Sequence, residues 1–166
     1  MEEIEMKSPY KVYHDCLKIC FDNKIPVADV IHVEINSRAK KRWGLCTKNP
    51  NGSYTIQISD RLLKDDVSQE ATFNTMIHEL IHTCPNCMNH GAEWKMWAEV
   101  INRNTQYKIK RTTSCAEKGV KEDAPKYIVA CRTCNHKWHY NRAGSVIQNL
   151  SRCKCPYCKD YTLYIK

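Results

Sequence analysis

The chain has 166 residues, with 26 Lys or Arg against 18 Asp or Glu, and its formal net charge is +8. This length fits one domain, or a main domain with a small appendage. No run of 18 apolar residues is present, and the first ten residues, MEEIEMKSPY, lack the apolar core of a secretory signal. We therefore expect an intracellular, cytoplasmic protein that does not enter a membrane.

The first third of the chain predicts one helix followed by a small sheet. Ser8 and Pro9 are residue types of a helix N-cap and first turn, and Pro26 is expected to end this helix. Three strands should follow, with the Asn-Pro-Asn-Gly turn at 49–52 forming a hairpin between the last two. Their expected ranges are Val30–Ile35, Lys41–Cys46 and Ser53–Ser59.

Two further helices are expected in the middle of the chain. Asp66 and Gln69 match a capping box, and apolar residues at helical spacing predict a helix from about Val67 to Thr83. Pro85 should end it, and a second helix is expected at about 91–104. Together with the strands, this order predicts an α+β fold.

The longer helix carries the sequence HELIH. His78 and His82 lie four residues apart, so both imidazoles can reach one cation from the same face. Glu79 lies one residue further round, where it can take a proton from a zinc-activated water. The pattern predicts a catalytic zinc site, which needs a third protein ligand and an open position. His90 is the preferred third ligand and Glu93 is the alternative.

The C-terminal residues 126–166 form a second metal-binding segment. They hold five of the eleven cysteines, and cysteines in a reducing compartment more often bind metal than form disulfides. Two Cys-x-x-Cys pairs predict a structural zinc ribbon with four thiolate ligands. The predicted ligands are Cys131, Cys134, Cys155 and Cys158. Cys153 competes with Cys155 for one position, and His136 is a weaker alternative.

A third cysteine pair, Cys84-Pro85-Asn86-Cys87, follows the HELIH helix. It could be a redox pair, or half of another zinc site completed by Cys46 or Cys115. The interpretation we favour is two loop thiols beside the catalytic site.

Between the two metal-binding segments, residues 112–125 lack periodicity and large apolar residues, which indicates a linker. The predicted organisation is therefore a catalytic domain at 1–111, a linker at 112–125 and a ribbon at 126–166.

Positive charge is concentrated in the predicted ribbon. Residues 126–166 carry eight Lys or Arg and one acid, which accounts for +7 of the chain's +8. Cations can follow phosphates while interleaved aromatic rings stack on unpaired bases, so we expect DNA binding, to single strands or junctions. The alternative is a solvated basic surface whose aromatic residues fill a small core. The candidate contact residues are Arg132, Lys137, Trp138, Tyr140, Arg142 and Lys154.

In this order, HExxH, a third histidine followed by Gly-x-x-Trp-Lys, and a four-cysteine zinc ribbon resemble the SprT-like family of zinc metallopeptidases. The segments RWGLC, YTIQISDRLL, MIHELIHT and NHGAEWKMWAEVIN carry the resemblance. It implies a zincin-like α+β catalytic domain with His78, His82 and His90 as ligands and Glu79 as general base. It also implies a nucleic-acid-binding ribbon.

The sequence is consistent with two functions. The first is a DNA-coupled, zinc-dependent endopeptidase that acts on DNA-bound or DNA-crosslinked proteins and holds two zinc ions, one catalytic and one structural. The second is a non-enzymatic, nucleic-acid-binding zinc protein. For the enzyme, the strand at Trp43–Cys46 either pairs with an extended protein substrate or lies inside the sheet. The sequence does not indicate an oligomeric state.

Overall fold

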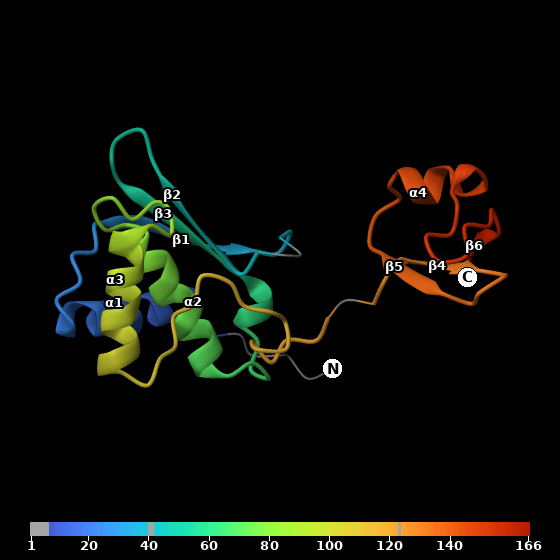
Figure 1. Ribbon diagram of the computed structural model, residues 1–166. Helices are drawn as coiled ribbons and strands as arrows, with labels where there is room; N and C mark the ends of the chain where they lie inside the picture. The colour runs from blue at the N-terminus through green and yellow to red at the C-terminus, as the bar shows by residue number, and fades with distance from the viewer. Residues whose placement is uncertain (1–6, 40–41, 123) are drawn as a thin grey trace. The chain divides into compact units, whose positions relative to one another are not determined.

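The computed structural model describes residues 7–39, 42–122 and 124–166. The chain divides into two compact units, Met1–Lys121 and Glu122–Lys166, which are described separately (Figure 1). The elements of the first unit are α1 (Pro9–Asp22), β1 (Val30–Asn36), β2 (Gly44–Lys48), β3 (Tyr54–Ser59), α2 (Gln69–Ile81) and α3 (Ala92–Asn104). The α+β fold and the predicted order of elements are confirmed.

The three strands of this unit form one sheet in the order β1-β3-β2. β1 runs parallel to β3, and β2 runs antiparallel to it with Cys46 opposite Ile56. The predicted hairpin is confirmed, and Gly52 supplies the positive φ of +85° that its turn requires. The expected strand start at Lys41 lies outside the described residues. Among the described strands, β2 pairs only with β3, so it is an edge strand and not an internal one.

The three helices gather on one side of this sheet (Figure 1). Ile56 and Ile58 of β3 are fully covered, as are Ile77 and Leu80 of α2, so the central strand and the central helix share the core. This packing holds α2 against the sheet next to the edge strand.

Serine caps the starts of α1 and α2. Ser8 accepts a hydrogen bond from the backbone of Lys11, as the sequence predicts. The predicted capping box at Asp66 is wrong: α2 begins at Gln69, and Ser68 accepts from the backbone N–H of Ala71. Serine is as good an N-cap as aspartate and stands next to the first helical residue.

The structure differs from the predicted linker over residues 112–121. This segment is part of the first unit and packs against its other elements: Lys118 is buried, and Trp43 donates a hydrogen bond to the carbonyl of Thr113. The backbone is irregular and is held by side-chain hydrogen bonds, which leave no periodic signal in the sequence. The division between units falls after Lys121.

The second unit is a small antiparallel sheet with a short helix. Its order is β5-β4-β6, and its core is small, formed around Val129, Ala130 and Cys155. The elements are β4 (Tyr127–Cys131), β5 (Lys137–Tyr140), α4 (Ser145–Gln148) and β6 (Leu163–Ile165). None of the helices in the described part of the chain has the length and apolar character needed to cross a membrane.

Candidate metal centre and catalytic cleft

Three histidines converge beside the C-terminal end of α2. His78 lies in the last turns of the helix, His82 caps it, and His90 comes from the loop before α3. The Nε2 atom of His78 is 3.3 Å from Nε2 of His82 and 3.0 Å from Nε2 of His90. Zinc bound by imidazole nitrogens at about 2.0–2.1 Å needs donor atoms grouped at this scale.

Backbone carbonyls fix the protonation of two of these rings. Nδ1 of His78 is 2.9 Å from the carbonyl oxygen of Lys110, and Nδ1 of His82 is 2.6 Å from that of Cys87. A carbonyl can only accept, so each Nδ1 carries the proton and each Nε2 is left with its lone pair. Burial also lowers the pKa of His78 to about 3, which keeps the ring neutral. Lone pairs facing one another at 3.3 Å repel unless a cation lies between them, so this donor set fits zinc.

The third position of the cluster is His90, and Glu93 does not belong to it. The indole of Trp94 packs against the group, with ring centroids 4.6 Å from His90 and 4.7 Å from His78. Trp94 is itself buried, so it holds the imidazoles in a dry setting.

Glu79 lies beside this cluster, against the edge strand. Only 6% of its surface is exposed, and its carboxylate accepts a hydrogen bond from the backbone N–H of Cys46. Burial raises the pKa of Glu79 to about 8. The approach is close because position 44 is glycine: a Cβ there would lie 2.7 Å from Cγ of Glu79 and nearer still to its carboxylate. Sequence reasoning missed this role of Gly44, which no spacing rule indicates.

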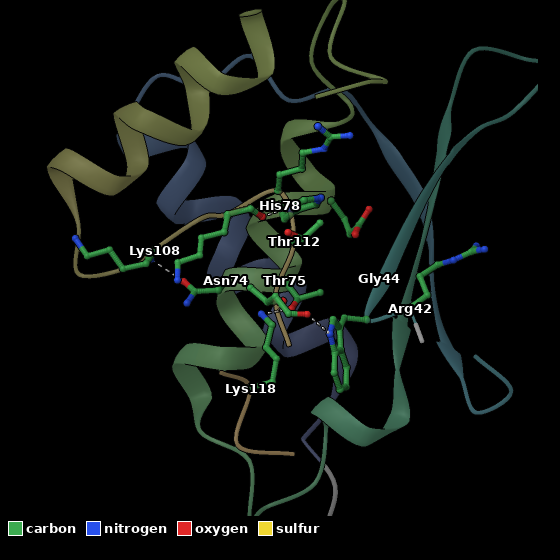
Figure 2. Close-up of a pocket in the computed structure, with 13 residues that line it drawn as sticks. Arg42, Gly44, Asn74, Thr75, His78, Lys108, Thr112 and Lys118 are labelled. Atoms are coloured by element: carbon green, nitrogen blue, oxygen red, sulfur yellow. Dashed lines mark hydrogen bonds between the residues drawn. The ribbon is translucent and has the colours of Figure 1, made fainter. Parts of the chain in front are cut away.

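A cleft of about 210 Å³ opens next to Glu79 and His78 (Figure 2). Its floor is α2, and its sides are the start of β2 and the irregular segment after α3. Glu79 is the only acid among the lining residues. The basic lining residues are Arg42, Lys108, Lys110, Arg111 and Lys118. Most of this charge comes from the segment that the sequence presents as a domain end and linker, so it was not foreseen.

Comparison with known proteins decides the family. The model of the SprT-like family matches residues 10–113, more than half of the chain. The chain belongs to the SprT-like family. A search of curated proteins found no matching relative. The family match covers the histidine cluster, Glu79 and the edge strand, and it ends before the second unit.

The second unit of this SprT-like chain brings four cysteines together. The Sγ atoms of Cys131 and Cys158 are 3.5 Å apart, as are those of Cys134 and Cys155. Tetrahedral zinc with bonds of about 2.3 Å places its sulfur atoms about 3.8 Å apart, so the cluster fits a structural zinc ion. Neither Cys153 nor the alternative ligand His136 is part of it.

Both cysteine knuckles have the same backbone form. The amide of Asn135 donates to the carbonyl of Cys131, and the amide of Lys159 donates to that of Cys155. Asn135 and Lys159 both have positive φ, 57° and 65°. The repeated turn explains why Cys155, and not Cys153, begins the second knuckle.

The six candidate nucleic-acid contacts lie on this unit, and their surroundings are more specific than the sequence indicated. The four Lys and Arg among these six candidates are exposed, while Trp138 and Tyr140 are half-buried. The Arg132 guanidinium lies 4.8 Å above the ring of Tyr164, and Lys154 lies 5.0 Å above Tyr161. Tyr164 and Tyr161, the rings that these two cations cover, are not among the predicted contact residues.

Cys84 and Cys87 do not join a metal cluster within the described ranges. Both are buried, and burial raises the pKa of the Cys84 thiol to about 12, which is unsuited to redox chemistry. What this loop contributes is the Cys87 carbonyl that holds His82. The interpretation as two loop thiols agrees with this setting.

Proposed function

We propose that this SprT-like protein is a zinc-dependent endopeptidase. The observation that carries the proposal is the convergence of three imidazole Nε2 atoms next to a buried carboxylate that lines a cleft, with two of the rings held through their Nδ1 atoms by backbone carbonyls. Zinc bound there would supply an acidified water and polarise the scissile carbonyl. His78, His82 and His90 would hold it.

The chain's own groups would complete the reaction. A zinc ion beside Glu79 would lower the pKa of this carboxyl again and favour its ionised form, so that Glu79 would take the proton of the attacking water and then hand it to the departing amine. The Cys46 amide orients the carboxylate, and the neighbouring backbone of β2 offers an unpaired strand edge. A substrate segment in extended form would bind there through main-chain hydrogen bonds, which suits varied protein substrates.

The rival function, a non-enzymatic zinc protein, explains less of this geometry. A purely structural site closes its fourth position with Cys or His, whereas the three-histidine cluster contains no fourth ligand among the described residues. A structural site also does not require a carboxylate that is buried beside the metal and faces a cleft.

We further propose that proteolysis is coupled to DNA through the second unit and serves DNA-bound or DNA-crosslinked proteins in the cytoplasm. One zinc with four thiolates contributes about −2, so the formal +7 of residues 126–166 becomes about +5. Exposed cations beside aromatic rings support binding to single-stranded DNA or junctions. Neutralising about four phosphates of a single strand predicts a slope of log K against log salt near −3.

A cleavage assay on an unstructured protein, with and without single-stranded DNA, tests both parts. The wild type should cut and should be stimulated by DNA, while Glu79→Gln should not cut although it still binds DNA. Cleavage by Glu79→Gln at the wild-type rate would remove Glu79 from the mechanism, and absence of cleavage by the wild type would refute the peptidase. DNA binding without salt dependence would refute the coupling.

A further inference from the structure

One lysine in the cleft is buried without an acidic partner. Lys118 exposes 5% of its surface, and its Nζ donates to the carbonyl of Ala71 at 3.0 Å and to Oγ1 of Thr75 at 2.7 Å. Both acceptors are neutral, and no carboxylate in the described part of the chain forms an ion pair with it. Burying an unpaired ammonium is unfavourable, so burial lowers the pKa of Lys118 to about 8.

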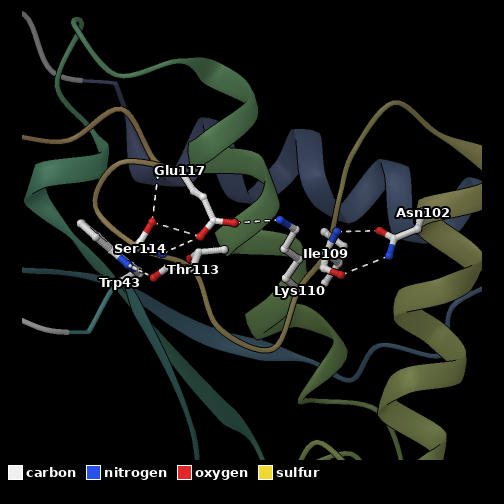
Figure 3. A network of polar contacts seen from close by, with 7 residues as sticks. All are labelled: Trp43, Asn102, Ile109, Lys110, Thr113, Ser114 and Glu117. Atoms are coloured by element: carbon white, nitrogen blue, oxygen red, sulfur yellow. Dashed lines mark hydrogen bonds and ion pairs between the residues drawn. The ribbon is translucent and has the colours of Figure 1, made fainter.

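The surrounding segment is built to hold this lysine in place. Glu117 accepts hydrogen bonds from Lys110 Nζ at 2.7 Å and from the Ser114 amide at 2.8 Å (Figure 3). Trp43 donates to the Thr113 carbonyl at 3.2 Å. Glu117 therefore braces the segment internally and Trp43 ties it to the start of β2, which restrains Lys118 in the cleft.

Lys118 lies close to the reacting groups but does not contact them. Thr75, its hydrogen-bond partner, precedes Glu79 by four residues on α2, which is about 6 Å along the helix. Figure 2 shows Lys118 beside Thr75, with His78 further along the same helix. The candidate zinc ligands His78 and His82 follow Thr75 by three and seven residues, about 5–10 Å along the helix. An extended polypeptide advances about 3.3 Å per residue, so Lys118 would face a substrate position about two residues from the cleaved bond.

The other charged residues that line the cleft are also mostly basic. Lys110 is neutralised by Glu117, at 2.7 Å. Arg42, Lys108 and Arg111 remain around the opening, and Glu79 is the only acid that lines it. Such a cleft attracts an anionic group and repels a cationic one.

We propose that the cleft contains a carboxylate subsite anchored by Lys118, which selects substrates bearing a carboxylate about two residues from the cleaved bond. The carboxylate is that of an Asp or Glu side chain or of the substrate's C-terminus. This inference rests on the proposed peptidase function and specifies its substrate.

A carboxylate fits this subsite better than a nucleic-acid phosphate does. An ammonium has three N–H donors, and two are already used, so one remains for a single oxygen. The cleft of about 210 Å³ is also smaller than the pockets of about 300–1,000 Å³ that accept larger ligands.

The test uses the zinc-loaded full chain and matched peptides. Each pair differs only by Glu or Gln at one position within three residues of the cleaved bond, and one further pair differs by a free or amidated C-terminus. The wild type should prefer the carboxylate at one position by about 10- to 100-fold in kcat/KM, the usual strength of a charge-assisted hydrogen bond. Lys118→Met should reduce that preference to less than about threefold.

Lys18→Met is the matched control, because Lys18 is an exposed residue of α1 that does not line the cleft. It removes the same charge and should keep the full preference. Anisotropy of the same labelled peptides on Glu79→Gln protein reads binding without cleavage, and should show the same Lys118-dependent preference.

The position of the preference identifies the source of the carboxylate: an internal position means a side chain, and the free C-terminus means the chain end. Equal kcat/KM for every pair would overturn the subsite while leaving the peptidase intact. Carboxylate-selective binding without any cleavage would instead refute the proposed peptidase function and support the subsite. A preference that persists in Lys118→Met, or a short oligonucleotide that binds the cleft through Lys118, would overturn the assignment.

Discussion

Replacing Lys118 with methionine should stabilise the first unit at neutral pH. The pKa of Lys118 falls from 10.5 to about 8 on folding, so holding its ammonium charged at pH 7 costs about 3 kcal/mol. Methionine keeps the length of the side chain and removes the charge. Two hydrogen bonds to neutral acceptors are lost, but Thr75 still donates to the Ala71 carbonyl at 3.1 Å. The net gain should be about 1–2 kcal/mol.

The stability difference between wild type and Lys118→Met should depend on pH. Between pH 8 and 10.5 the unfolded chain binds more protons at Lys118 than the folded chain does, so wild-type stability rises with pH through that window. The advantage of Lys118→Met should therefore be largest at about pH 7 and should vanish by about pH 10.

Urea unfolding of the zinc-loaded proteins at several pH values measures this difference. Tryptophan fluorescence is a suitable signal, because three of the four tryptophans, Trp43, Trp94 and Trp97, belong to the first unit. A variant that is less stable than wild type by more than about 1 kcal/mol at neutral pH would contradict the reasoning. So would a difference that stays constant across the pH range.

Two further predictions concern the metal-binding geometry. Gly44→Ala should lower kcat by about 100-fold or more with zinc retained, because the added Cβ displaces the Glu79 carboxylate; unchanged kcat in a folded variant would exclude this contact. Cys155→Ser should remove the zinc of the second unit and unfold it, whereas Cys153→Ser should leave both intact, as measured by zinc content and far-UV circular dichroism. The reverse result would exchange the two ligands.

The sequence is most informative where chemistry requires a fixed spacing. Two histidines four apart on an amphipathic helix, and two Cys-x-x-Cys turns, can be recognised locally. In the structure the histidines lie in one candidate metal cluster and the four cysteines form another. His90 was preferred over Glu93 from the sequence as the third donor, and the structure groups it with His78 and His82.

The sequence is least informative where function depends on what a residue packs against. Gly44 matters only because Glu79 approaches it from another element. Lys118 looks like one more exposed lysine in an aperiodic segment, and its burial depends on Ala71 and Thr75, more than 40 residues earlier. The capping error has a local origin: Asp66 and Ser68 are both residue types that cap helices well, and the helix begins after the second.

Zinc content of the purified chain tests the central claim, a three-histidine zinc centre, most directly. After dialysis against a mild chelator, wild type and Glu93→Ala should each retain two zinc ions per chain, and His90→Ala should retain one, because only His90 completes the cluster on α2. Two zinc ions in His90→Ala together with one in Glu93→Ala, or a single zinc in wild type, would contradict it.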